Sequence, residues 1–321
     1  MHLPELGGKG VLVTGGAGFI GSHLVDALVE RGARVRVLDD LSTGTRENLA
    51  HLEGRIELVE GDVRDVDACR RACEGVELVF HQAALGSVPR SMADPATTLA
   101  VNAGGTANVF AACREAGVRR VVWASSSSVY GDSEVLPKRE GEEGEPLSPY
   151  AASKAIGETL ARVFARFYPL APVGLRYFNV YGPRQDPQGP YAAVVPRFFA
   201  AALAGRPATI YGDGTQSRDF TFVADAVAAN LLAAGAPASA AGRAYNVASG
   251  RRTTVLELAR LVAETAGGAP APVHEPPRPG DVPHSLADLS RARAELGYAS
   301  RFSLAQGLRA SLGHYRELAG G

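Results

Sequence analysis

Short apolar runs alternate with helical patterns through the first half of the chain. Runs rich in β-branched residues and bounded by turn residues predict strands over Val11–Thr14, Arg34–Leu38, Ile56–Glu60, Leu78–His81, Val121–Ser125 and Gly174–Phe178. Between them, apolar residues at helical spacing predict helices, among them Ser22–Arg31, Val63–Ala72 and Thr97–Ala116. Because strands that alternate with helices form a parallel sheet covered on both faces, we expect an α/β fold with a doubly wound parallel sheet.

The second half has longer loops and denser proline. Its pattern predicts a helix over Ala192–Ala204, a strand near Ala208–Tyr211, a strand over Ala244–Val247, and helices over Val223–Ala234 and Val255–Ala266. We expect the last two helices to return to the sheet. By residue ranges, the predicted division is a sheet domain of 1–178 with 223–250, and a smaller mixed α/β C-terminal cap of 179–222 and 251–321.

Composition narrows the class of protein. The 321 residues include 33 Lys+Arg and 34 Asp+Glu, a balance without the basic excess that nucleic acids or anionic membranes require. No apolar run approaches the roughly 18 residues of a membrane span, and the first predicted strand leaves no room for a signal peptide before it. The cysteines show no metal-ligand spacing. We therefore expect a cytoplasmic protein with no metal site and no nucleic-acid or membrane partner.

A glycine-rich turn joins the first strand to the first helix. The sequence GGAGFIG contains Gly15, Gly18 and Gly21, which permit a tight turn, a close approach to a pyrophosphate, and packing of the helix on the strand. The helix N-terminus then favours phosphates. Asp39 ends the second strand, where an acid accepts hydrogen bonds from ribose hydroxyls and repels a 2′-phosphate. The pattern predicts a Rossmann-type sheet that binds NAD rather than NADP, although Arg46 in the next loop could soften that preference.

A second constellation follows the fifth strand. Tyr150 and Lys154 stand at i,i+4 in YAASK, on a helix that Ser148 can cap with Pro149 in its first turn. The spacing brings phenol and ammonium to one helical face, where we expect the cation to lower the Tyr150 pKa toward that of a general base. The run Ser125–Ser128 adds a hydroxyl at the end of the strand. Taken alone, the Tyr–Lys pair could be a surface coincidence and the serine run a turn.

Together these motifs resemble the extended short-chain dehydrogenase/reductases that act on nucleotide sugars. The resemblance covers essentially the whole length and rests on TGGAGFIG, LDDLSTG, GDVRD, HQAAL, SSSSVYGD, SPYAASK and RYFNVYGPRQDP. Within that family, LGSVPRS, RQDPQGPYAAVVP, GDGTQSRDF and GDVPHSLAD are most similar to bacterial UDP-N-acetylglucosamine 4-epimerases. The resemblance implies bound NAD, a UDP-sugar held by the cap, and a homodimer formed through the helices around Thr97–Ala116 and Tyr150–Tyr168.

The resemblance also implies roles for individual residues. Ser126 would be the catalytic serine, Tyr150 the base and Lys154 its activator. The expected cofactor positions are Gly15, Gly18, Phe19, Ile20, Gly21, Asp39, Asp40, Ser42, Gly44, Asp62, Val63, Ala83, Ala84, Asn102, Tyr150, Lys154 and Tyr177. The expected substrate positions are Gly86, Ser87, Ser126, Ser127, Ser128, Asn179, Val194, Arg218, Arg278, Asp281 and Ser285. Arg218 and Arg278 would bind the phosphates, because arginine suits bidentate contacts.

The expected reaction is inversion at C4 of a UDP-hexose through a transient 4-keto sugar, and three alternatives stay open. A dehydratase of this family carries carboxylates directly after the catalytic hydroxyl, where Ser127 and Ser128 stand in this chain. A reductase or dehydrogenase would exchange free cofactor. A regulatory NAD-binding protein would have lost the chemistry, which the Ser–Tyr–Lys set argues against.

Substrate choice depends on Ser285, four residues after Asp281. In the related epimerases a bulky aromatic at this position excludes an N-acetyl group, whereas a serine leaves room for one. Gly86 and Ser87 also keep the pocket wall small. We expect UDP-GlcNAc and UDP-GalNAc to be accepted, together with UDP-glucose and UDP-galactose. UDP-glucuronic acid is the alternative substrate, for which Arg90 is a candidate cation near C6.

Overall fold

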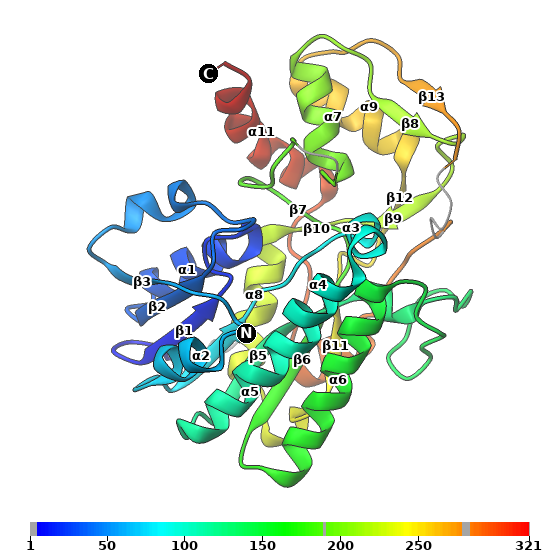
Figure 1. The fold of residues 1–321 in the computed structure, drawn as a ribbon. Helices are drawn as coiled ribbons and strands as arrows, with labels where there is room; N and C mark the ends of the chain where they lie inside the picture. Colours follow the sequence, from blue (N-terminus) through cyan, green and yellow to red (C-terminus); the bar gives the residue numbers. More distant parts are fainter. Residues whose placement is uncertain (1–4, 189–190, 278–282, 321) are drawn as a thin grey trace.

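The computed structural model describes residues 5–188, 191–277 and 283–320 (Figure 1). Its centre is a seven-stranded sheet in the order β11-β6-β5-β4-β1-β2-β3, in which every neighbouring pair runs parallel. The strands are β1 (Gly10–Thr14), β2 (Arg34–Asp39), β3 (Ile56–Glu60), β4 (Leu78–His81), β5 (Arg120–Ser126), β6 (Ala171–Tyr177) and β11 (Ala244–Val247). The predicted doubly wound parallel sheet is confirmed, and the predicted strand over Ala244–Val247 forms one edge.

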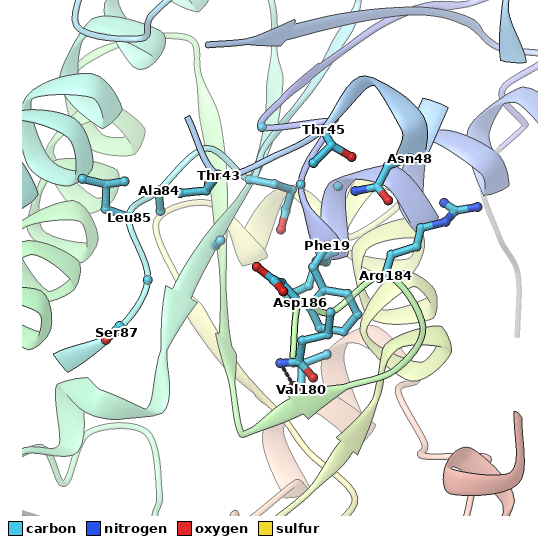
Figure 2. Close-up of a pocket in the computed structure, with 18 of the residues that line it drawn as sticks. Phe19, Thr43, Thr45, Asn48, Ala84, Leu85, Ser87, Val180, Arg184 and Asp186 are labelled. Carbon is cyan, nitrogen blue, oxygen red and sulfur yellow. Dashed lines mark hydrogen bonds between the residues drawn. The ribbon is translucent and has the colours of Figure 1, made fainter. Parts of the chain in front are cut away.

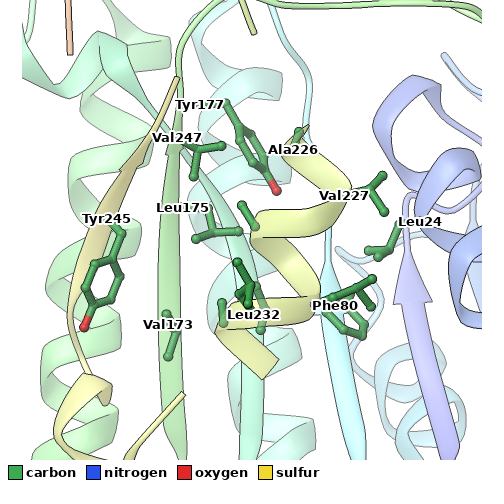
Figure 3. Close-up of a cluster of buried hydrophobic side chains, with 14 of the residues drawn as sticks. Leu24, Phe80, Val173, Leu175, Tyr177, Ala226, Val227, Leu232, Tyr245 and Val247 are labelled. Carbon is green, nitrogen blue, oxygen red and sulfur yellow. The ribbon is translucent and has the colours of Figure 1, made fainter. Parts of the chain in front are cut away.

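Helices cover both faces of the sheet because successive strand residues point to opposite sides. On β1, Val11 and Val13 belong to one apolar cluster and Leu12 to the other. Figure 3 shows part of the first cluster, where α8 crosses the strands. The helices packed in that cluster are α1 (Phe19–Glu30), α8 (Val223–Ala234) and α10 (Ser290–Leu296). The helices packed in the second are α2 (Val66–Cys73), α5 (Gly105–Glu115) and α6 (Pro149–Phe167).

The cap lies beyond one end of the sheet (Figure 1) and has its own apolar cluster. Its helices are α7 (Val194–Leu203), α9 (Val255–Ala266) and α11 (Leu304–Gly320). Its strands form three two-stranded pairs: β7 (Val180–Tyr181) with β10 (Thr221–Phe222), β9 (Ser217–Asp219) with β12 (Arg252–Thr254), and β8 (Thr209–Tyr211) with β13 (Val273–Glu275). The mixed α/β character expected of the cap is thus present.

The helix predicted over Val255–Ala266, which is α9, does not return to the sheet as expected. The apolar face of α9, formed by Leu258, Ala259 and Val262, packs in the cap cluster against α7 and α11. That prediction was therefore wrong, whereas α8 does pack on the sheet. Conversely, Leu289 and Leu296 belong to the cluster on the sheet, although the sequence-based division counts them with the cap. The exact residue division stays a prediction.

Several helices differ from their predicted bounds. The first begins at Phe19 rather than Ser22. α2 begins at Val66 rather than Val63, because the Asp65 carboxylate caps it by accepting hydrogen bonds from the first-turn N–H groups. The helix predicted over Thr97–Ala116 is interrupted: α4 (Pro95–Leu99) is followed by a π-helical turn (Ala100–Gly104) and then by α5. Such π turns are frequent at functional sites.

The remaining elements are short. They are the helix α3 (Val88–Ala93) and the 3-10 helices η1 (Arg46–Leu52), η3 (Ser127–Tyr130) and η4 (Ala238–Ala240). In the described part of the chain, no helix combines the length and the apolar character that a membrane span needs. The same residues contain no group of three or more His, Cys, Asp or Glu side chains placed to hold a metal ion.

Candidate active site

A cavity of about 1240 Å³ lies between the sheet and the cap, and Figure 2 shows part of its wall. The segments that follow β1, β2, β4, β5 and β6 line one side, and residues of the cap from α7 and α11 line the other. In a doubly wound sheet, ligands bind outside the carboxyl ends of the strands, where the strand order reverses. That reversal occurs at β1, which has β4 on one side and β2 on the other. The cavity is therefore the candidate active site.

The glycine-rich turn after β1 leaves no space for side chains. Gly15 has a φ of +68°, and a Cβ on it would lie 2.5 Å from the Ala83 nitrogen. A Cβ on Gly21 would lie 2.0 Å from the Gly15 carbonyl oxygen, so the start of α1 packs directly on the turn. Gly18 and Phe19, where α1 begins, line the cavity. The free N–H groups of this helix end form a cradle that fits the pyrophosphate of a dinucleotide.

Asp39 ends β2 at the edge of the cavity and is almost fully buried. Its Oδ2 accepts a hydrogen bond from the Ala17 N–H at 2.8 Å, and its Oδ1 accepts one from the Leu41 N–H at 2.9 Å. Burial raises the Asp39 pKa, and the two hydrogen bonds oppose that effect. The carboxylate thus joins the glycine-rich turn to the loop after β2, at the place where the sequence predicts a contact with ribose.

Three expected cofactor positions do not line the cavity. Gly44 packs under the glycine-rich turn, where a Cβ would lie 2.6 Å from a backbone carbon of that turn. Asp62 forms an ion pair with Arg64 at 2.5 Å. Asn102, in the π-helical turn, accepts a hydrogen bond from the Leu85 N–H at 2.8 Å and so fixes the loop after β4. The expected positions that do line it are Gly15, Gly18, Phe19, Ile20, Gly21, Asp39, Asp40, Ser42, Val63, Ala83, Ala84, Tyr150, Lys154 and Tyr177.

The structure brings Ser126, Tyr150 and Lys154 together at this cavity. Ser126 is the last residue of β5. Tyr150 and Lys154 lie in the first turns of α6, which the Ser148 hydroxyl oxygen caps by accepting a hydrogen bond from the Ala151 N–H at 3.1 Å. The Lys154 ammonium lies 5.8 Å from the centre of the Tyr150 ring and donates a hydrogen bond to the Ala124 carbonyl at 2.8 Å.

Burial controls the proton affinities of this group. It raises the Tyr150 pKa, and a hydrogen bond with Ser126 opposes the rise. Burial also lowers the Lys154 pKa to about 8. The expectation that the Lys154 cation brings the Tyr150 pKa below its usual value was therefore wrong, because burial outweighs the effects that favour the phenolate. The sequence pattern placed the two groups on one helical face but could not show how dry that face is.

Backbone strain is concentrated at the same site. In the described residues, the non-glycine residues with positive φ are Leu41, Ser87, Asn179 and Arg184. The last three line the cavity, and Leu41 follows Asp40, which also lines it. Such conformations are costly and tend to cluster at ligand and catalytic sites. This distribution is independent support for the site.

The expected substrate positions divide between two cavities. Val194 and Arg218 line a smaller cavity of about 360 Å³, which shares Asn179, Val180 and Gln185 with the larger one. The substrate positions that line the larger cavity are Gly86, Ser87, Ser126, Ser127, Ser128 and Asn179. The two cavities therefore adjoin at the segment after β6. This arrangement suits a ligand that places one part in each cavity.

The other expected substrate positions are Ser285, Arg278 and Asp281. Ser285 is half-buried and lines neither cavity, and its N–H donates a hydrogen bond to the Ser217 carbonyl at 3.0 Å on β9. Arg278 and Asp281 lie outside the described residues, so their expected contacts stay predictions.

Sequence reasoning missed several lining residues. Arg184 and Asp186 come from the loop after β7, and His314 and Tyr315 come from α11. Figure 2 shows Arg184 and Asp186 beside the start of α1. The Arg184 guanidinium forms an ion pair with Asp26 of α1 at 2.8 Å. The motif RYFNVYGPRQDP contained the signal for the first two, whereas nothing in the local pattern of α11 indicated that it reaches the site.

Comparisons with known proteins agree with this geometry. Residues 11–248 match the NAD dependent epimerase/dehydratase family. The chain is 43% identical to UDP-glucose 4-epimerase of Mycolicibacterium smegmatis over 309 residues, which is 95% of this chain and 98% of that protein. The solved UDP-N-acetylglucosamine 4-epimerase of Methanobrevibacter ruminantium, in complex with UDP-N-acetylmuramic acid, has a TM-score of 0.92 and 38% identity, covering 97% of this chain and 99% of that one. UDP-glucose 4-epimerase of Thermus thermophilus in complex with NAD has a TM-score of 0.88 and 41% identity, covering 96% and 99%.

Proposed function

The chain belongs to the NAD-dependent epimerase/dehydratase family, and from that premise we propose that it inverts C4 of UDP-hexoses with NAD as its cofactor. It is accordingly an isomerase. The observation that carries the proposal is that Ser126, Tyr150 and Lys154 line the same cavity as the dinucleotide cradle of Gly15 and Asp39. One cavity therefore holds a phosphate-binding turn, a ribose-binding acid and a group that moves a proton.

Tyr150 moves the proton. As the phenolate it takes the proton from the sugar 4-hydroxyl, and it returns a proton to the same oxygen at the end of the cycle. Ser126 assists because its hydrogen bond favours the charged form of Tyr150. Lys154, with a pKa of about 8, carries its positive charge at neutral pH and holds it near the phenol ring. NAD held in this cavity would supply an acceptor and donor for the C4 hydride, so the reaction would have no net redox change.

The residues around Ser126 favour epimerisation over dehydration. Ser127 and Ser128 line the cavity directly after it. The Ser126 hydroxyl oxygen accepts hydrogen bonds from the Ser128 N–H at 3.1 Å and from its hydroxyl at 3.0 Å. Eliminating water from the sugar needs an additional acid/base pair, and neither hydroxyl provides one.

The cap binds the UDP part and leaves the sugar free to turn. In the proposal, Asn179, Arg218 and Arg278 contact the diphosphate, Val194 lines the uracil, and Asp281 contacts the uridine ribose. The proximity of the two cavities supports this arrangement, since Asn179 lines both. A fixed UDP and a mobile 4-keto sugar are what return of hydride to the opposite face requires.

The substrates proposed are UDP-GlcNAc and UDP-GalNAc, with UDP-glucose and UDP-galactose. The small cavity wall at Gly86 and Ser87 supports acceptance of an acetamido group, whereas the expected part of Ser285 stays a prediction, because Ser285 lines neither cavity. The alternative of a uronic acid has less support, because Arg90 does not line the larger cavity and instead lies 5.2 Å from the centre of the Tyr191 ring. Asp186, which does line that cavity, would repel a sugar carboxylate.

We further propose a homodimer. Ile156, Val163 and Phe167 are exposed on α6 at spacings that place them on one face. An exposed apolar stripe of this kind marks an association surface. A cytoplasmic location stays a prediction.

The function is tested by incubating the purified protein with UDP-GlcNAc, UDP-glucose or UDP-glucuronic acid and resolving the products by NMR of the anomeric proton. We expect UDP-GalNAc and UDP-galactose to form without added reductant, and Tyr150→Phe to abolish turnover while it still binds NAD and UDP. No product from the first two substrates, even after NAD is supplied, would overturn the proposal. Turnover of UDP-glucuronic acid alone would establish the alternative.

A further inference from the structure

A buried ion pair lies directly behind the catalytic group. Arg176 on β6 donates to Glu158 on α6 twice, from Nε to Oε1 at 2.8 Å and from Nη2 to Oε2 at 2.6 Å. The side chains are only 4% and 8% exposed. Desolvation offsets most of the attraction in such a pair, so a buried salt bridge is a weak source of stability. Its place next to the catalytic residues points instead to a role in their geometry.

Glu158 joins two elements that carry catalytic residues. Its Oε1 also accepts a hydrogen bond from the Ser125 hydroxyl at 2.7 Å. Ser125 immediately precedes Ser126 on β5 and lies opposite Arg176 in the sheet register. On α6, Glu158 follows Lys154 by one helical turn and Tyr150 by two. A single carboxylate therefore connects the strand end that carries Ser126 to the helix that carries Tyr150.

Arg176 is held from two further sides. Its Nη1 forms an ion pair with Glu143 Oε1 at 2.5 Å, and its guanidinium lies 4.9 Å from the centre of the Tyr130 ring. The Tyr130 hydroxyl donates to Asn246 Oδ1 on β11 at 2.7 Å. Hydrogen bonds and charge from Glu158 raise the Arg176 pKa against the effect of burial. The guanidinium is thus a fixed, permanently charged anchor for Glu158.

We propose that Ser125, Glu158 and Arg176 are positioning residues that set the distance between the Ser126 hydroxyl and the Tyr150 phenol. The hydrogen bond between those two groups spans two elements, and it favours the charged form of Tyr150. A hydrogen bond weakens steeply with distance and angle. A small separation of β5 from α6 therefore raises the pKa of the base and slows proton transfer. The inference rests on the proposed function, because its main readout is turnover.

Ser125→Ala is the sharpest probe, because it removes only the hydroxyl that ties β5 to Glu158. We expect kcat to fall roughly tenfold, as small misplacements of reacting groups do, with KM for the UDP-sugar and the NAD content unchanged. The acid limb of the kcat–pH profile moves to higher pH by about half a unit. The matched control is Ser311→Ala, which removes an equally buried hydroxyl that donates to the Gly307 carbonyl on α11 at 2.8 Å. It should leave both kcat and the profile unchanged.

A second variant tests the anchor. Glu158→Gln keeps the size of the side chain and an oxygen that can accept from Ser125, but it loses the charge that orients it on Arg176. Its kcat should fall further than that of Ser125→Ala, with the same direction of pH shift. Ultraviolet difference titration of the phenol, with Tyr150→Phe as background, measures the Tyr150 pKa without turnover. That pKa should rise in both variants.

The outcomes separate this inference from the proposed function. A wild-type protein that inverts no UDP-sugar overturns the proposed function, while the titration still tests the positioning role. An active wild type together with a folded Ser125→Ala variant of normal kcat and unchanged pH profile overturns the positioning role alone. A fall in kcat without any pH shift would also overturn it, because the proposed effect acts through the Tyr150 pKa.

Discussion

At the scale of single residues, burial from solvent sets the protonation states of the catalytic group. Burial disfavours the charged forms of both Tyr150 and Lys154. The Tyr150 pKa therefore rises and the Lys154 pKa falls, and each shift favours the neutral form of its group. A base in such a place depends on its neighbours: the Ser126 hydroxyl stabilises the phenolate, and a charged Lys154 does so only below the lysine pKa. The active state is therefore limited to a window of pH.

The Lys154 pKa of about 8 predicts a change in slope within that window. Above this pH the amine loses its charge while the phenolate, whose pKa is higher, is still gaining, so the rise of wild-type kcat with pH should level off near pH 8. Lys154→Met should lower kcat at pH 7 by about 10²-fold or more, the contribution typical of a positioned acid/base group. The kcat of the variant should keep rising with pH through 8 instead of levelling off.

Steady-state kinetics between pH 6 and 10 tests this, with Lys138→Met as the control. Lys138 is also buried, but its ammonium donates to the Ser133 carbonyl, and the residue does not line the catalytic cavity. A kcat that still levels off near pH 8 in Lys154→Met would assign that change to another group and contradict the prediction.

At the scale of elements, the local sequence pattern predicted the bounds of some helices but not the surfaces against which they pack. The bounds of α8 and α9 agree with the prediction because both helices have continuous apolar periodicity between clear turn signals. The same pattern could not show which surface covers α9, because an apolar face fits a cap cluster as well as a sheet. The π-helical turn escaped prediction for a related reason: it places Asn102 against Leu85, a contact between distant parts of the chain.

The exposed face of α6 carries a prediction of its own. Val163→Asp puts a charge in the middle of the apolar stripe and should convert a dimer to a monomer, because an unpaired charge in an apolar interface is costly. Sedimentation velocity measures the change. Val66→Asp is the matched control, because the two valines are 42% and 41% exposed and both are helical. A monomeric wild type, or a Val163→Asp variant that stays dimeric, would contradict the dimer and its proposed surface.

At the scale of the whole molecule, the site depends on joining the cap to the sheet, which no local pattern shows. Asp219 on β9 is fully buried, and its carboxylate accepts hydrogen bonds from the Ser249 N–H at 2.9 Å, the Ser249 hydroxyl at 2.6 Å, the Gly250 N–H at 3.0 Å and the Ala287 N–H at 3.3 Å. Ser249 and Gly250 follow β11 of the sheet, and Ala287 lies two residues beyond Ser285. One carboxylate thus fixes the sheet edge, the strand of Arg218 and the segment of Ser285 relative to one another.

This arrangement predicts that Asp219→Asn separates UDP binding from NAD binding. The amide turns a donor toward backbone N–H groups that need an acceptor, so the protein should lose on the order of 2–3 kcal/mol of unfolding free energy, the range for buried hydrogen bonds to a charged group. KM for the UDP-sugar should rise severalfold while the NAD content stays unchanged, because the cradle of Gly15 and Asp39 lies on other strands. Denaturant unfolding and steady-state kinetics measure both effects.

Asp213→Asn is the control, since Asp213 accepts similar hydrogen bonds from Thr215 in an exposed turn of the cap. Equal effects of the two variants on KM would show that Asp219 has no special part in aligning the UDP site.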